Sequence, residues 1–257
     1  MNSSPELECI DVHISFDHSL VVDQFSLAFP RGQITAILGP LGVGKSSILG
    51  ALNRLNELVE EYTVEGRILF QGQDIYDPKV DPLKIRQSIV TLFTAPHLFP
   101  KSIFENIAWA PRILFPQNDL EAVVQQSLEK VNLWSEIKDR LRHPAVRLSA
   151  GQQQRLCLAR ALAVKPSVVL MDEPTSTLDP ISTQKFEEIL RTLTAEYTLV
   201  LASSNLQQVG RVSDNTALFL PGPERRGTLI ESGATQELFL NPQQRLTEEY
   251  FSGRFTR

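Results

Sequence analysis

Eight residues at positions 39–46 form a motif that could bind the phosphates of a nucleotide. They read Gly-Pro-Leu-Gly-Val-Gly-Lys-Ser and match the pattern G-x-x-x-x-G-K-[ST]. Glycines in such a loop let successive backbone N–H groups turn inward around phosphate oxygens. Lys45 can reach the β- and γ-phosphates, and the Ser46 hydroxyl can bind Mg²⁺. The predicted nucleotide site comprises Gly39, Pro40, Leu41, Gly42, Val43, Gly44, Lys45, Ser46 and Ser47.

Two carboxylates follow an apolar segment farther along the chain. Residues 168–171 read as a buried strand, and Asp172 and Glu173 come directly after it. An acidic pair after a strand is usually solvated surface, but a P-loop in the same chain reverses that interpretation. In P-loop proteins the first carboxylate typically holds the metal. We therefore predict Ser46 and Asp172 as magnesium ligands and Glu173 as the group that polarises the attacking water.

The third candidate is a helix start at Ser149, Ala150, Gly151 and Gln152. Ser149 followed three residues later by Gln152 is a capping box, which is a purely structural reading. A capped helix start with a glycine is also an end that can bind phosphate. Both interpretations remain open at the level of this motif.

Short apolar segments alternate with helical patterns and must position these motifs. Residues 33–38 predict a strand before the glycine-rich loop, and a helix from Lys45 to about Leu58 follows it. Further strands are expected at 64–70, 89–93, 168–171, 198–202, 217–220 and 228–231. Further helices are expected at 102–110, 119–131, 134–141, 150–164, 206–212 and from Asp179 to about Glu196.

The alternation of strands and helices predicts an α/β fold with a largely parallel sheet. Two alternating segments, at 7–16 and 25–29, predict an antiparallel β part at the N-terminus. Helical patterns punctuated by prolines predict an inserted helical block. We expect a single domain over 1–257, with a core lobe at 1–101 and 149–257 and a helical subdomain at 102–148.

Composition excludes several classes of protein. The 257 residues are 42% hydrophobic and 21% charged, as is typical of a globular chain. A net charge of −5 argues against nucleic acid as a partner. No apolar stretch approaches the ~20 residues that cross a bilayer. Cys9 and Cys157 fit neither a disulfide framework nor a zinc site, and the four histidines form no close-spaced ligand set.

In this order and spacing, the three motifs resemble those of the ATP-binding subunits of ATP-binding cassette (ABC) transporters. The resemblance covers almost the whole chain and implies the P-loop fold of ABC ATPases, with ATP and Mg²⁺ as ligands. It implies that Ser149–Gln152 are a signature that acts on the ATP of a partner subunit. Asp179 lies in a segment similar to the family's D-loop. Phe16 lies where the family often stacks an aromatic ring on adenine, although a core role explains Phe16 equally well.

Other segments are similar to the ATP-binding subunits of Pst-type phosphate importers. They lie at 52–56, 75–78, 98–106, 152–164, 178–183 and 253–255. None of them shows phosphate chemistry by itself, so the transported solute is inferred from resemblance alone. The resemblance implies two membrane-spanning permease subunits, an indirect role for a phosphate-binding protein, and a peripheral position on the cytoplasmic face of the plasma (inner) membrane.

Three positions depart from the family pattern. Thr94 stands where the family carries the Q-loop glutamine, and Ser204 stands where it carries the switch histidine. Neither side chain can place a long polar group at the γ-phosphate, and the loss of one preorganised donor typically costs ~10²–10³ in rate. Ala150 adds one methyl group to the usual Leu-Ser-Gly-Gly-Gln signature, and we expect it to be tolerated.

The resemblance also implies head-to-tail dimers, either homodimers or heterodimers with another ABC ATP-binding subunit. In such dimers each ATP lies between the P-loop of one subunit and the signature of the other. Thr94 and Ser204 would then serve the chain's own site, and Ser149–Gln152 the partner's site. Two functions remain open: an ATP-hydrolysing subunit of a phosphate importer, or an ATP-binding regulatory or heterodimer partner subunit with weak hydrolysis. ABC-type ATPases of DNA repair are disfavoured, because no heptad segment for a long coiled coil fits in this chain.

Overall fold

In the computed structural model, which describes residues 4–222, 224 and 226–255, ten strands form one sheet. Their order across the sheet is β5-β4-β1-β2-β10-β9-β3-β8-β7-β6. The strands are β1 (Leu7–Phe16), β2 (Ser19–Phe29), β3 (Ile34–Leu38), β4 (Tyr62–Phe70), β5 (Gln73–Asp74), β6 (Ile89–Leu92), β7 (Val168–Asp172), β8 (Thr198–Ser203), β9 (Asn215–Pro221) and β10 (Gly227–Ala234).

The sheet has a parallel part and an antiparallel part. Strands β6, β7, β8, β3 and β9 are parallel neighbours. Strand β1 pairs antiparallel with β2 and β4, as the alternating N-terminal segments predicted. Strand β10 comes from near the C-terminus, pairs antiparallel with β9 and parallel with β2, and so joins the two parts. The predicted α/β fold with a mostly parallel core is confirmed.

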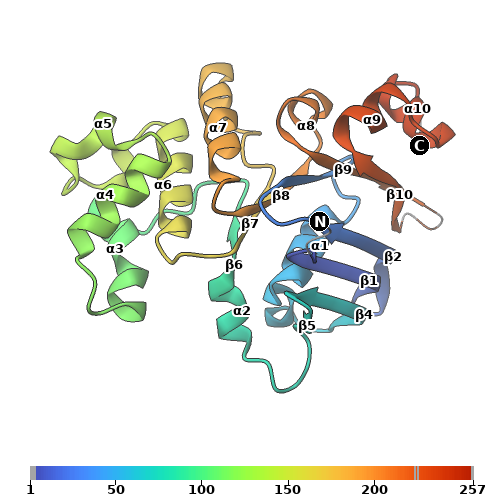
Figure 1. Ribbon diagram of the computed structural model, residues 1–257, viewed down its shortest axis with the longest axis horizontal. Coiled ribbons are helices and arrows are strands. Elements are labelled where there is room, and N and C mark those ends of the chain that lie inside the picture. Colours follow the sequence, from blue (N-terminus) through green and yellow to red (C-terminus); the bar gives the residue numbers. More distant parts are fainter. Residues whose placement is uncertain (1–3, 223, 225, 256–257) are drawn as a thin grey trace.

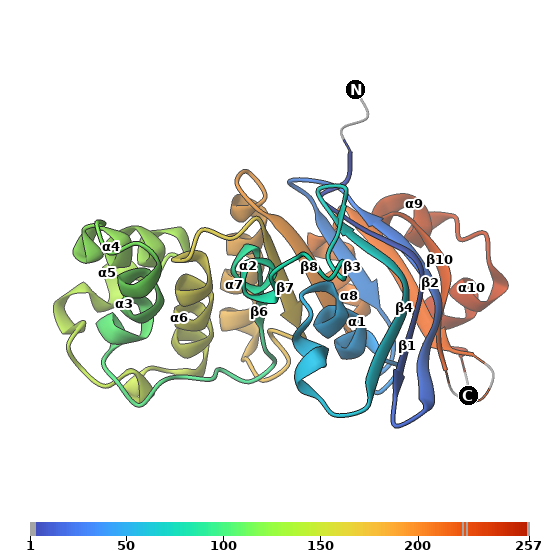
Figure 2. The ribbon, with the colours of Figure 1, turned by 90° about the horizontal axis from the view of Figure 1, so that it is seen from below.

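The helices lie on both faces and at one end of this sheet (Figures 1 and 2). The α-helices are α1 (Lys45–Leu52), α2 (Pro82–Ser88), α3 (Ile103–Leu114), α4 (Leu120–Lys130), α5 (Trp134–Ile137), α6 (Ala150–Leu162), α7 (Pro180–Leu193), α8 (Leu206–Val212), α9 (Thr235–Leu240) and α10 (Arg245–Phe251). Single 3₁₀ turns are η1 (Leu55–Leu58), η2 (Lys138–Arg140) and η3 (Ala145–Arg147).

Alternate side chains of β7 supply two separate cores, because successive residues of a strand point to opposite faces. Val168 and Leu170 pack in the core that contains α1 and the antiparallel strands. Val169 and Met171 pack in the core that contains α6, α7 and the helical block. A third core lies between α8 and strands β3 and β9, with side chains of α9 and α10 packed against it. Helix α1 therefore lies between the two parts of the sheet (Figure 2).

Helices α3, α4 and α5 lie together at the end of the molecule away from the antiparallel strands (Figures 1 and 2). Their own apolar side chains fill the outer part of the core that α6 and α7 share. The division of the chain into a core lobe and a helical subdomain at 102–148 stays a prediction.

Two predicted helix boundaries are wrong. The helix expected from Lys45 to about Leu58 ends at Leu52, because Arg54 adopts φ 61° and its guanidinium donates to the carbonyls of Ile75 and Val80. Helix α3 runs to Leu114 instead of ending before Pro111, which lies inside it. Helix α2 was not predicted; Asp81 caps it and Pro82 is its first residue.

Candidate functional site

The glycine-rich loop joins the end of β3 to the start of α1. Gly39 continues the ladder, because its N–H donates to the carbonyl of Ser203 at the end of β8 (3.2 Å). Gly44 precedes α1 with φ 102°, a conformation that favours glycine, and a Cβ there would meet Val22 at 3.1 Å. No side chain caps α1 and no acidic residue lies in its first turn. Its first N–H groups are therefore open to an anion.

Lys45 is the buried cation of this loop. Its Nζ donates to the carbonyls of Gly39 (2.8 Å) and Pro40 (2.9 Å), and lies 3.3 Å from Oε1 of Glu173. Burial lowers the pKa of Lys45, while the carboxylates of Glu173 and Asp172 act in the opposite direction. The ammonium thus lies between the loop carbonyls and the acid, where phosphate oxygens could replace the carbonyls as its partners.

Glu173 follows β7 directly and has φ 44°, an uncommon backbone conformation for a residue other than glycine. Its N–H donates to the carbonyl of Ala202, the neighbouring position on β8 (2.9 Å). Oε1 is buried and has no partner in hydrogen-bond geometry, although Lys45 lies close to it. A buried carboxylate oxygen without a donor is suited to accept a proton from a bound water.

Thr94 and Ser204, the two positions that depart from the family pattern near Glu173, have different surroundings. The Thr94 hydroxyl donates to the carbonyl of Asp172 (2.9 Å), and so it ties the end of β6 to the end of β7. Ser204 is half-buried and lines a cavity of about 780 Å³ together with Glu173. The hydroxyl of Thr94 is therefore engaged by the protein backbone, and the short side chain of Ser204 faces open space.

The signature residues begin α6, and the predicted capping box is present. Ser149 Oγ accepts from the N–H of Gln152 (3.3 Å), and the Gln152 side chain accepts from the N–H of Ser149 (3.2 Å). Gln152 Nε2 also donates to Glu136 (2.9 Å). Gly151 is buried against α7, where an added Cβ would lie 2.5 Å from Ser182 Oγ. Ala150 is exposed, which leaves room for its methyl group.

Two more predicted residues have evident structural contacts. Asp179 caps α7 and accepts from the N–H and the hydroxyl of Ser182 (3.0 and 2.6 Å), and these bonds lower the pKa of Asp179. Phe16 is half-buried, its ring centroid lies 5.3 Å from that of Tyr62, and it packs on the core around α1. Neither arrangement tests the predicted nucleotide contact.

A metal ion would need oxygen ligands from outside the protein at this site. Across residues 4–222, 224 and 226–255, no three His, Cys, Asp or Glu side chains gather in a way that could hold a metal. Ser46 lies exposed in the first turn of α1, and Asp172 lies at the end of β7 close enough to influence Lys45. A hydroxyl and a carboxylate beside a phosphate site suit Mg²⁺, which usually takes one or two protein ligands and substrate phosphates.

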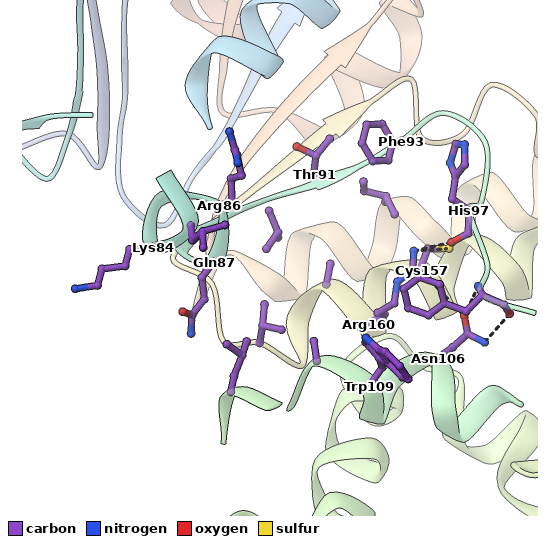
Figure 3. A pocket seen from close by; sticks show the side chains of 18 of the residues that line it. Lys84, Arg86, Gln87, Thr91, Phe93, His97, Asn106, Trp109, Cys157 and Arg160 are labelled. Atoms are coloured by element: carbon purple, nitrogen blue, oxygen red, sulfur yellow. Dashed lines mark hydrogen bonds between the residues drawn. The ribbon is translucent and has the colours of Figure 1, made fainter. Parts of the chain in front are cut away.

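A cleft of about 650 Å³ is lined by Phe93 and Ala95, the neighbours of Thr94 in the sequence, and by residues of several other elements (Figure 3). Helix α2 and strand β6 line one side, and α3 and α6 line the other. Arg160 crosses its floor: it donates to the carbonyl of His97 (2.7 Å) and its guanidinium lies 4.7 Å from the ring centroid of Phe99. The cleft is largely apolar in its side chains, which include Leu83, Phe93, Phe99, Trp109 and Leu114.

The model of the ABC transporter family matches residues 22–176. The chain belongs to the ABC transporter family. "Phosphate import ATP-binding protein PstB 1" of Synechococcus sp. (strain JA-3-3Ab) is 47% identical over 254 residues, which cover 97% of this chain and 92% of that protein. "Phosphate import ATP-binding protein PstB" of Salinibacter ruber (strain DSM 13855 / M31) is 46% identical over 251 residues, which cover 98% and 99%. The resemblance inferred from the motifs is confirmed.

Solved structures of ABC proteins share the fold. The structure of cbiO1 from Clostridium perfringens, part of the ABC transporter complex cbiONQ, matches with a TM-score of 0.79 at 26% identity and covers 93% of this chain and 92% of that chain. A bacterial Atm1-family ABC exporter with ATP bound matches at 23% identity with a TM-score of 0.78. It covers 100% of this chain and 43% of the exporter, and shows the fold alone. In the described part of this ABC chain, no helix is both long and apolar enough to cross a membrane.

Some polar residues of this ABC chain were not singled out from the sequence. Gln154 is fully buried and donates to the carbonyl of Phe93, the residue before Thr94 (3.0 Å). Glu136 accepts from the buried Arg155 with both carboxylate oxygens. Gln208 is 1% exposed. The available signal for Gln208 was its place in the helical pattern. It lies next to Val209 and on the same helix face as Val212, where an apolar residue is expected.

Proposed function

We propose that this chain binds Mg-ATP and hydrolyses it to drive the import of inorganic phosphate through separate membrane subunits. The observation that carries the proposal is the 3.3 Å between Lys45 Nζ and Glu173 Oε1, at the carboxyl edge of parallel strands. Phosphoryl transfer needs a cation at the γ-phosphate and a group that orients the attacking water beside it. Lys45 and Glu173 supply these two groups at one place.

The start of α1, Lys45, Ser46 and the two carboxylates after β7 each have a proposed role. The backbone N–H groups at the start of α1 hold the phosphates, and Lys45 exchanges the carbonyls of Gly39 and Pro40 for γ-phosphate oxygens. Glu173 orients a water and accepts its proton as the water attacks the γ-phosphate. Ser46 and Asp172 would hold Mg²⁺, which when bound neutralises the developing charge on the phosphates.

The exposed start of α6 supports pairing with a second ABC ATP-binding subunit. Ser149 Oγ accepts from a backbone N–H within its own chain, so its proton remains free to donate across an interface. We infer that Ser149–Gln152 donate to the γ-phosphate on the partner, with Asp179 beside them at the start of α7. Phe16 is the proposed stacking partner for adenine.

Phosphate as the transported solute rests on the names of the relatives, several of which are phosphate import ATP-binding proteins. The chain would contact phosphate only indirectly, through two permease subunits that receive it from a phosphate-binding protein. The cleft lined by Phe93 and Ala95 is the proposed docking place for the permeases, since Leu83 (70%), Trp109 (44%) and Phe99 (38%) are unusually exposed there. The chain would then lie on the cytoplasmic face of the inner membrane.

The test is Mg-ATP turnover by the purified chain, with Glu173→Gln as the blank and ATP binding measured in both. Turnover above the blank, raised further by permease subunits and phosphate in vesicles, is the expected result. A rate that does not respond to the permeases and phosphate would contradict the transport role. Turnover equal to the blank would contradict hydrolysis by this chain.

A second candidate is an ATP-binding subunit that hydrolyses weakly and pairs with a different, intact subunit. Thr94 favours it, because its hydroxyl is bonded to the Asp172 carbonyl instead of reaching a ligand. Ser204 favours it, because it cannot extend across the cavity beside Glu173. In such a heterodimer the partner's ATP would still be completed by Ser149–Gln152. Tight ATP binding without turnover, and turnover once an intact partner is added, would support this candidate.

A further inference from the structure

A buried polar cluster lies beneath the turn that carries Glu173. Its centre is the side-chain amide of Gln208, on α8. Oε1 of Gln208 accepts from Ser203 Oγ (3.0 Å), and Nε2 donates to Thr175 Oγ1 (2.6 Å) and to Glu187 (3.4 Å). We call Ser203, Gln208, Thr175 and Glu187 the Gln208 cluster. All four side chains are buried. The three bonds of Gln208 connect α8 to the end of β8, to the turn after Glu173 and to α7.

The Gln208 cluster connects the turn that follows Glu173 with the loop that contains Ser204. Thr175 lies two residues after Glu173, in the turn where Ser176 Oγ donates to the Glu173 carbonyl (3.1 Å). Ser203 ends β8, directly before Ser204, and its hydroxyl oxygen also accepts from the N–H of Asn205 (3.0 Å). One amide therefore spans the turn at 173–176 and the loop at 203–205.

The charge around Gln208 fixes which way its amide points. Glu187 on α7 accepts from Arg211 at 2.9 and 2.8 Å, and so presents an acceptor to Gln208. Only the NH₂ group of the amide can face a carboxylate, which leaves Oε1 to accept from Ser203. A carboxylate in place of this amide would face Glu187 with a like charge, although the Thr175 hydroxyl could still donate to it.

We propose that Gln208 is a positioning residue for ATP hydrolysis, because its amide holds the turn at 173–176 against the loop at 203–205 and thereby sets the Glu173 carboxylate. Glu173 depends on such support, since its backbone is at φ 44° and its Oε1 has the ion pair with Lys45 at 3.3 Å but no hydrogen bond from the described residues. The short Ser204 adds no contact of its own across the cavity. This inference rests on the proposed function of ATP hydrolysis.

The test is Gln208→Glu, read as kcat and KM for Mg-ATP. A misplaced Glu173 slows the chemical step, and small displacements of this kind cost about tenfold to 10²-fold. We expect kcat to fall by that factor while KM changes less than about twofold, since the groups that hold ATP are untouched. Gln207→Glu is the matched control, because it makes the same chemical change at the adjacent, exposed position. We expect it to turn over like the parent.

A swapped pair separates positioning from damage to the core. Gln208→Glu combined with Glu187→Gln again places one amide against one carboxylate, and we expect it to recover most of the lost kcat. If Gln208→Glu does not fold, Thr175→Val removes the other end of the bond without a change of volume, and the same fall in kcat is expected. Hydrogen exchange at 173–178 should rise in Gln208→Glu and not in Gln207→Glu.

The outcomes that overturn the inference are distinct from failure of the proposed function. Equal kcat in folded Gln208→Glu and Gln207→Glu would overturn it, as would a swapped pair no faster than Gln208→Glu alone. An unchanged kcat in Thr175→Val would also overturn it where that variant is the one used. A parent chain no faster than Glu173→Gln overturns ATP hydrolysis itself, whatever the Gln208 variants do.

Discussion

The region around Lys45 and the region around Ser149 differ in where their polar side chains are engaged. Around Lys45, the Thr94 hydroxyl bonds the Asp172 carbonyl and Ser204 is short. Around Ser149, the capping box is complete, and Gln152 and Arg155 both donate to the Glu136 carboxylate.

The two departures that replace a long polar side chain, Thr94 and Ser204, both fall on one half of the chain's proposed duties, whereas Ala150 in the signature only adds a methyl group. The P-loop region keeps the residues proposed to hold the phosphates and to orient the attacking water. Beside them, Thr94 and Ser204 are shorter than the glutamine and histidine of the family pattern. The signature region keeps Ser149 and Gly151 in a helix start that the rest of the chain supports. If the proposed dimer forms, a subunit built in this way would complete a partner's ATP site better than its own.

The largest expected effect tests whether the P-loop region is catalytic at all. Glu173→Gln keeps the shape of the side chain but cannot accept a proton from water, so turnover should fall by about 10²–10⁴-fold while ATP remains bound. Phosphate release and nucleotide binding measure the two quantities. Glu188→Gln, an exposed carboxylate on α7, is the control and should leave both unchanged. Turnover within twofold of the parent would remove Glu173 from the mechanism.

The next effect tests whether the two departed positions limit the rate. Thr94→Gln with Ser204→His restores long polar groups at the γ-phosphate, and turnover should rise by about 10²-fold, since one such donor is worth that much. The two gains need not multiply, because both act on one phosphate. Ser232→His, on the exposed face of β10, controls for the added imidazole. No rise would mean that Thr94 and Ser204 are tolerated and that the difference between the two regions does not limit the rate of ATP hydrolysis.

A smaller effect concerns the signature region. Ser149→Ala removes the acceptor for the Gln152 N–H, and loss of an N-cap costs about 1 kcal/mol. The free energy of unfolding in urea should fall by that amount, and the ATP affinity of the monomeric chain should not change, because the proposed contact of Ser149 is with the ATP of a second subunit. Ser135→Ala, an exposed serine in α5, is the control and should stay within about 0.5 kcal/mol of the parent. A weaker ATP affinity in Ser149→Ala would break the separation of the two regions.

The smallest effect concerns the anchor of the signature region. Burial raises the pKa of Glu136, but hydrogen bonds from Gln152 and Arg155 lower it more, and the net shift is downward. A depressed pKa in the folded state stabilises the fold above the unfolded value, near 4.5, and this contribution is lost as the pH falls below it.

Glu136→Gln should therefore lower the free energy of unfolding at pH 7 by less than about 1 kcal/mol, and the difference should be smaller at a pH below 4.5. Urea unfolding at both pH values measures it, with the exposed Glu60→Gln as control. A deficit that is the same at both pH values would mean that the charge of Glu136 does not matter.

Most of the fold was predictable because its signals are local. The apolar segments of β3, β7 and β8 and the caps at Ser149 and Asp179 lie where the sequence placed them. The wrong end of the helix that starts at Lys45 comes from long-range contacts. Arg54 ends a helical pattern because it reaches Ile75 and Val80, twenty-odd residues away.

The candidate site divides in the same way. The P-loop, Asp172 and Glu173 were recognisable because each motif carries its chemistry in consecutive residues. The bond of Thr94 to the Asp172 carbonyl joins residues 78 apart. The bonds of Gln208 join α8 to the turn at 173–176 and to α7. Such partners are decided by packing, and no spacing along the chain reports them.

Strand β6 lies at the edge of the sheet, and this position gives it a mechanical role. Only β7 pairs with it among the described strands, and the Asn53 amide from the end of α1 bonds its Thr91 hydroxyl (2.8 Å). An edge strand is the one that costs least to displace, because a single ladder must stretch. A segment bound in the cleft would contact β6 and could displace it. The displacement would reach Asp172 through Thr94, and the end of α1 through Asn53. If the permeases bind in the cleft as proposed, displacement of β6 would transmit that contact to the nucleotide site without a glutamine at position 94.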